Sequence, residues 1–151
     1  ESLRTHIADM DKRFRALASA HPACSILMTV PGVGPITALS FFSAIGDPFR
    51  FDRNRDVGPY LGLTPSVHQS GVLSRSGRIS RFGNKMTRTH LVSAATVLLC
   101  TTKKQSALQT WGLELSRKVG LSKARVAVAR KMAVIMLGMW KSGSAFEPGH
   151  T

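Results

Sequence analysis

The sequence predicts a mostly α-helical domain: a helix-hairpin-helix, then a basic Gly/Ser loop, then a bundle of C-terminal helices. Three observations indicate this fold. Apolar residues recur at helical spacing along most of the 151 residues, no long run alternates as a β-strand would, and Gly or Pro separates the helical segments. The hydrophobic fraction of 43% is sufficient for a folded core, and the length fits one domain.

The first predicted helix covers residues 2–19. Its apolar residues are spaced four, three, four and three apart, as in a coiled-coil seam: Leu3, Ile7, Met10, Phe14 and Leu17. A seam this short is equally typical of an amphipathic helix that packs on its own domain, so both alternatives stay open. His21-Pro22 ends the helix, because proline disfavours helical geometry in the residue before it. Since the chain opens at Glu1 inside this pattern, we expect it to be part of a longer protein.

Short helices are expected over residues 24–29 and 35–45, on either side of the sequence Pro31-Gly32-Val33-Gly34. This is the pattern of a helix-hairpin-helix. Gly32 and Gly34 let the backbone approach a phosphate without a Cβ in the way, and the amides that begin the second helix favour an anion. Val33 would anchor the turn in the core. The alternative is a plain tight turn that only joins two helices.

In the middle of the chain, turn and cap residues predict the local structure. Asp47-Pro48 indicates a turn, and Asp52 is expected to cap a short helix over residues 53–61. Residues 62–83 are rich in Gly, Ser, Pro and Arg, which predicts a loop. A small β-hairpin that turns at Ser76-Gly77 fits within it.

Three helices are expected in the C-terminal half, over residues 84–100, 105–119 and 122–141. Their predicted boundaries are Gly120 after the second helix, Ser122 as the cap of the third, Trp140 or Lys141 at its end, and Gly143 beyond it. The last segment, residues 144–151, is predicted to be a flexible tail.

The charge points to a polyanionic partner. The chain has 21 Lys and Arg residues against 8 Asp and Glu, a net charge of +13. Nucleic acid is the leading partner and a membrane surface the weaker one, because the most apolar stretch contains Arg130 and Lys131 and is too short to span a bilayer. Cys24 and Cys100 lack zinc or disulfide spacing, so we expect two buried free thiols.

The basic loop carries the candidate chemistry. Arg75, Arg78 and Arg81 recur at every third position, and Lys85 and Arg88 follow. A serine hydroxyl among guanidinium groups suits attack on phosphorus, because the cations neutralise charge on the phosphate oxygens. The competing hydroxyls are Ser66, Ser70, Ser74, Ser76 and Ser80, and His68 would share a strand face with Ser70. The alternative is a solvated basic loop whose serines only hydrogen-bond phosphates.

The acidic residues predict no metal site in this chain. A two-metal nuclease needs several carboxylates around ions about 4 Å apart. Only Asp47, Asp52 and Asp56 lie near one another in the sequence, and their positions are typical of turn and cap residues.

Three linked motifs occur in order over about residues 25–100: PGVGPITALSFFSAIGDPFRF, VGPYLGLTPSVHQSG and GRISRFGNKMTRTHLVSAA. In them the chain resembles the C-terminal domain of bacterial insertion-sequence transposases of family one-ten. The resemblance implies a preceding resolvase-like domain whose four acids bind Mg²⁺, then a coiled coil that ends within residues 1–22. The C-terminal domain itself would cover residues 23–143.

The resemblance also implies an activity. Members of the family are recombinases guided by a bridge RNA, and a serine of this domain becomes joined to DNA. By motif position that serine is Ser70, which would meet the acids of the other domain across protomers of a homo-oligomer. We therefore expect the isolated chain to be inactive, and the complete protein to be cytoplasmic, at the nucleoid. The alternative is a non-enzymatic helix-hairpin-helix module that binds DNA or RNA, which explains the charge and the turn equally well.

Overall fold

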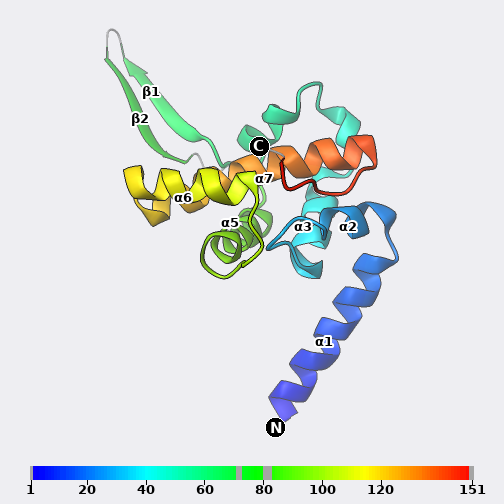
Figure 1. The fold of residues 1–151 in the computed structure, drawn as a ribbon. Coiled ribbons are helices and arrows are strands. Elements are labelled where there is room, and N and C mark those ends of the chain that lie inside the picture. Colours follow the sequence, from blue (N-terminus) through cyan, green and yellow to red (C-terminus); the bar gives the residue numbers. More distant parts are fainter. Residues whose placement is uncertain (1, 71–72, 80–82, 150–151) are drawn as a thin grey trace.

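One long helix near the C-terminus organises the domain. In the computed structural model, which describes residues 2–70, 73–79 and 83–149, α7 (Leu121–Ser142) crosses the middle of the molecule (Figure 1). The helices α5 (Lys85–Cys100) and α6 (Ala107–Val119) pack against it. Its inward residues are fully buried: Val128, Ala129, Met132, Ala133, Met136 and Leu137. The predicted mostly α-helical fold is confirmed.

The first helix, α1 (Ser2–Ser19), has the predicted bounds and projects from the rest of the domain (Figure 1). Its apolar seam is largely uncovered: Leu3 is 73% exposed, and Ile7, Met10 and Leu17 are exposed as well. Among the described residues of α1, Ala18 alone is buried. Packing along its whole length against its own domain, one of the two alternatives, is therefore wrong.

The helices α2 (Pro22–Leu27) and α3 (Pro35–Ile45) flank the Pro-Gly turn. α3 has the predicted bounds, with Pro35 in its first turn and Gly46 at its C-terminal cap. α2 begins two residues earlier than predicted, because a proline is well tolerated in the first turn of a helix.

Three short helical turns follow, η1 (Pro48–Arg50), η2 (Asn54–Asp56) and α4 (Val57–Tyr60). The predicted turn is present, and the Asp47 carboxylate accepts a hydrogen bond from the Phe49 amide at 2.9 Å. The predicted cap at Asp52 is wrong, because the helical turn begins at Asn54 with Arg53 in the capping position.

The strands β1 (Pro65–Ser70) and β2 (Leu73–Ile79) form an antiparallel hairpin that extends away from the helices (Figure 1). The hairpin is confirmed, but its predicted turn is wrong. Ser70 pairs with Leu73, so the chain reverses between them, and Ser76 pairs with Val67 within the strands. The dipeptide Ser-Gly occurs at both 70–71 and 76–77, so turn chemistry alone does not choose between them.

Side chains cap two of the C-terminal helices. Asn84 accepts from the amide of Thr87 at 3.0 Å, and Ser106 accepts from that of Gln109 at 3.2 Å. The predicted cap at Ser122 is wrong, since α7 already begins at Leu121.

The end of the last helix and the segment after it contact the domain. Gly143 lies at the C-terminal cap of α7, as predicted, and its backbone adopts the left-handed helical conformation. The amide of Phe146 donates to Thr29 Oγ1 at 2.9 Å, and the amide of Ala107 donates to the carbonyl of Pro148 at 2.8 Å. Part of the expected tail is thus tied to the domain. None of the described helices is both long and apolar enough to cross a membrane.

Candidate nucleic-acid interface

The two glycines of the Pro-Gly turn have different roles. Gly32 has a φ of +92°, and a Cβ there would lie 2.5 Å from the carbonyl oxygen of Ala94 on α5. Gly32 is therefore needed for packing against α5, and its contact with a phosphate stays a prediction. A Cβ on Gly34 would have no heavy atom within 4 Å. Val33 is 6% exposed and anchors the turn in the core, as predicted.

The start of α3 has backbone donors without acceptors. Gly34 occupies the capping position and has no side chain, and Pro35 has no amide hydrogen. The first hydrogen bond of the helix joins the amide of Ala38 to the carbonyl of Gly34 at 3.0 Å. Among the described residues, the amides of Ile36 and Thr37 have no partner. Such a helix end, with its partial positive charge, favours an anion.

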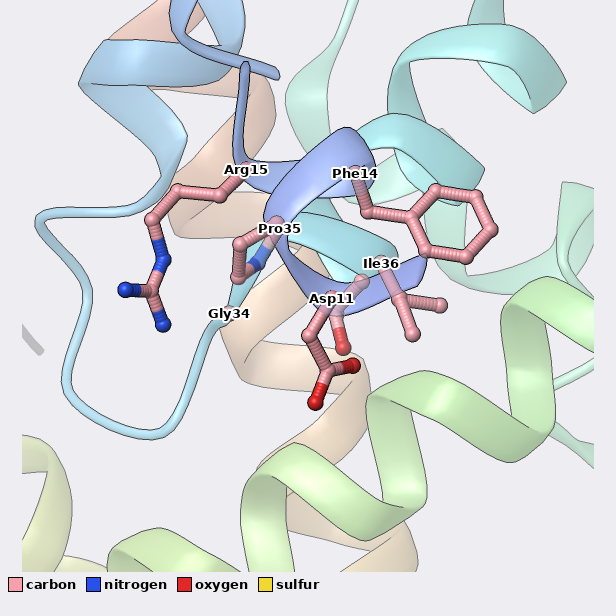
Figure 2. Close-up of a pocket in the computed structure, with 7 residues that line it drawn as sticks. Asp11, Phe14, Arg15, Gly34, Pro35 and Ile36 are labelled. Atoms are coloured by element: carbon pink, nitrogen blue, oxygen red, sulfur yellow. The ribbon is translucent and has the colours of Figure 1, made fainter. Parts of the chain in front are cut away.

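A cavity of about 280 Å³ opens where α1 passes the start of α3 (Figure 2). Asp11, Phe14 and Arg15 of α1 line one side of it. The other side is formed by residues 34–37 at the start of α3. The cavity is thus shared by the exposed helix and the turn.

The chain segments before and after the hairpin contact each other. Gly83, with a φ of +87°, leaves no room for a Cβ because it would collide with the carbonyl oxygen of Tyr60 at the end of α4. Arg88 of α5 is 9% exposed, and its Nη1 donates to the carbonyl of Leu61 at 3.3 Å. Arg88, expected to bind phosphate, serves the fold in this structure.

The hairpin carries most of the other predicted site residues. Ser70 is the last residue of β1, and His68 pairs with Arg75 on the neighbouring strand. Arg78 also belongs to β2. The competing serines divide between the strands, with Ser66 in β1 and both Ser74 and Ser76 in β2.

The remaining candidates flank the hairpin. Lys85 is exposed at the first position of α5. Arg81 and Ser80 lie outside the described residues. The fold therefore brings Ser70, His68, Arg75 and Arg78 together on one two-stranded element.

Helix α7 adds a cation that the sequence analysis did not select. A Cβ on Gly58 would lie 3.1 Å from Cγ of Arg130 and 3.5 Å from Cγ2 of Thr64, so the Arg130 stem passes beside the start of the hairpin. Arg130 is half-buried and has no ion pair or hydrogen bond among the described residues. In the sequence, the sign of this residue is a charge within the long apolar segment of the last helix.

The charges are distributed unevenly along the chain. Between Asp56 and Glu114 the sequence has seven Lys and Arg residues and no acidic residue. The two ion pairs formed by described side chains, Arg13 with Asp9 at 2.9 Å and Arg53 with Asp56 at 3.1 Å, both precede this segment. This excess of basic over acidic residues in the sequence favours a polyanionic partner.

The chain offers no metal centre within its described part. No group of three or more His, Cys, Asp or Glu side chains comes together there, so these residues do not fit the Mg²⁺ site implied for the family. Cys24 is buried as predicted, and burial raises the pKa of its thiol. The prediction for Cys100 is wrong, since it is exposed at the end of α5.

Comparison with known proteins gives the family. The model described as "Transposase IS116/IS110/IS902 family" matches residues 24–110. The transposase for insertion sequence element IS1111A of Coxiella burnetii is 36% identical over 131 residues, which cover 86% of this chain and 36% of that protein. A probable family 20 transposase of Pseudomonas aeruginosa is 29% identical over 150 residues, 99% of this chain and 44% of the relative. The pilin gene-inverting protein of Moraxella bovis is 27% identical over 148 residues, 93% of this chain and 45% of the relative.

The chain spans less than half the length of these three relatives. The family match nevertheless covers more than half of the chain and includes both the Pro-Gly turn and the hairpin. The chain belongs to the IS116/IS110/IS902 family of transposases.

Proposed function

We propose that this domain binds DNA and supplies the serine nucleophile of a recombinase, with Ser70 forming the covalent link to the DNA. One observation carries the proposal: Ser70 ends β1 at the far end of a hairpin that extends away from the helices, between α4 and α5 in the sequence. A protruding element of this kind can enter a DNA groove or contact a neighbouring domain, where a serine nucleophile must be positioned next to the phosphate.

The chemistry is a transesterification at phosphorus. The oxygen of the Ser70 hydroxyl forms a bond to the phosphorus of a DNA phosphodiester, while the bond from phosphorus to one deoxyribose oxygen breaks. The serine gives its proton to a base, and the released sugar oxygen gains a proton. Attack by a sugar hydroxyl on the phosphoserine reverses these changes, so the DNA is rejoined without an external energy source.

Cations of the same element stabilise the charge that develops on the phosphate oxygens. Arg75, Arg78 and Arg81 have this role in the proposal, and Lys85 binds an adjacent phosphate. Arg88 is left out, because its guanidinium is buried against Leu61.

The rest of the active site belongs to a second domain in this proposal. A resolvase-like domain with four acids holds Mg²⁺ next to Ser70, across protomers of a homo-oligomer. A bridge RNA selects the sites that are joined. The support for these parts is the family membership and the short length of the chain relative to its relatives.

The test compares three alanine variants of the complete transposase that contains this domain. Ser70→Ala removes the nucleophile, while Ser66→Ala and Ser74→Ala remove hydroxyls from the same hairpin. We expect Ser70→Ala to lower strand exchange by at least about 10⁴-fold, as for other essential nucleophiles, and to leave DNA affinity unchanged. The two control variants keep their activity.

The assay follows a protein–DNA species that survives denaturant. The proposal expects it in the parent protein and in both control variants, and expects none with Ser70→Ala. Recombination by Ser70→Ala would place the nucleophile elsewhere. Tight DNA binding without any covalent species in the parent protein would instead support a non-enzymatic DNA-binding module.

A further inference from the structure

The cavity between α1 and the start of α3 has the groups of a phosphate site. We propose that it binds one phosphodiester group of DNA through the amides of Ile36 and Thr37, the Thr37 hydroxyl and the guanidinium of Arg15. The inference rests on the proposed function in that the domain binds DNA. It is independent of Ser70, which lies on the hairpin, a different element.

The backbone of α3 supplies the first part of the site. Gly34 and Pro35 leave the helix start without a side-chain cap, and the amides of Ile36 and Thr37 lack acceptors among the described residues. All four residues line the cavity. Two parallel amides and the positive end of an eleven-residue helix are suited to a phosphate oxygen.

The side chain of Thr37 is the second, independent part. It is 9% exposed and its hydroxyl has no hydrogen-bond partner among the described residues. A threonine hydroxyl can donate one hydrogen bond. A phosphate oxygen in the cavity would accept that hydrogen bond.

The exposed helix α1 supplies the charge. Figure 2 shows the side chains of Arg15 and Asp11 extending from α1 beside the start of α3, and both residues line the cavity. Neither forms an ion pair among the described residues, whereas Arg13 and Asp9, on the same helix, pair with each other at 2.9 Å. Arg15 thus keeps its charge available for an anion in the cavity.

Asp11 has the opposite effect. Its carboxylate places negative charge near the positive end of α3, which is favourable when the cavity holds no anion. A bound phosphate would be repelled by it. The two charged groups of α1 therefore act on the ligand with opposite signs, and the position of α1 controls both.

The volume of the cavity suits this ligand. At about 280 Å³ it accommodates a phosphate group and several water molecules, each of which takes about 30 Å³.

The experiment measures binding of a fluorescein-labelled DNA duplex to the 151-residue chain by anisotropy over a range of salt concentrations. Arg15→Ala is expected to weaken binding by about tenfold, the effect of one charge-assisted hydrogen bond. It should also reduce the slope of log K against log salt by about 0.9, the value for one phosphate contact. Lys12→Ala removes an equal charge from an exposed position of α1 outside the cavity, and should change affinity by less than about twofold.

The direction in which Asp11→Asn changes DNA affinity is the decisive result. It should strengthen DNA binding by about threefold, the magnitude of an exposed charge interaction. Weaker binding with Asp11→Asn, or equal effects of Arg15→Ala and Lys12→Ala, would overturn the inference. If Arg15→Ala weakened binding to an RNA duplex of the same sequence and left binding to the DNA duplex unchanged, the assignment to DNA would be overturned.

This outcome is separable from that of the proposed function. Failure of the phosphate site leaves the covalent species of the parent transposase intact. Failure of the Ser70 proposal leaves the binding defect of Arg15→Ala intact.

Discussion

Gly32→Ala should destabilise the domain strongly, and the structure gives the size of the effect. The φ of +92° at Gly32 is a conformation that costs an alanine about 1–2 kcal/mol. The new Cβ would also lie 2.5 Å from the Ala94 carbonyl oxygen, so the turn would have to move about 0.9 Å to restore ordinary contact.

That movement is opposed by a close-packed interior. A Cβ on Gly32 would also lie 3.3 Å from the amide nitrogen of Leu98, and the neighbouring Val30 and Val33 are buried. Overpacking of this kind costs about 1–3 kcal/mol. The sum of strain and overpacking is about 2–5 kcal/mol, a large part of the stability of a typical domain.

The assay is thermal unfolding of the chain followed by far-ultraviolet circular dichroism. We expect Gly32→Ala to lower Tm by about 4–20 °C, at 2–4 °C per kcal/mol for a chain of this length. Gly34→Ala is the matched control, because Gly34 has a φ of −97° and open space around its Cβ position. It should change stability by less than about 1 kcal/mol. Equal Tm values for Gly32→Ala and the parent chain would refute this account of the turn.

Two further predictions concern the hairpin base and the cysteines. Gly83→Ala should lower Tm, because the new Cβ collides with the Tyr60 carbonyl at the end of α4; an unchanged Tm would show that this close approach is dispensable. Cys100 should react with a thiol reagent in the folded chain, whereas Cys24 reacts only on unfolding, because burial both covers its thiol and raises its pKa. Equal rates for the two thiols, measured by mass spectrometry of the labelled chain, would contradict the burial of Cys24.

Local sequence signals predicted the bounds of a helix correctly where no second signal of the same kind lay nearby. Pro35 and Gly46 bracket a continuous apolar segment, and α3 has the predicted bounds. The heptad spacing of α1 predicted its length correctly. It did not decide whether the seam packs on the domain, because that depends on the direction in which the chain leaves α1.

The sequence did not predict features for which two equal signals occur, or features that depend on contacts between distant residues. Ser-Gly at 70–71 and at 76–77 are equal turn candidates, and pairing along the strands decides between them. The packing role of Gly32 was missed, because nothing local indicates that Ala94, far along the sequence, lies against it. Arg88 resembles a surface cation in the sequence, and its burial depends on the carbonyl of Leu61.

The most direct test of the central claim is to locate the DNA-linked residue. The covalent species formed by the complete transposase would be isolated in denaturant, treated with nuclease and trypsin, and analysed by fragmentation mass spectrometry. Cleavage after Arg55 and Arg75 gives one peptide that contains Ser66, Ser70 and Ser74. The account predicts a nucleotide remnant on Ser70. A remnant on either of the other two serines, or on a different peptide, would contradict it.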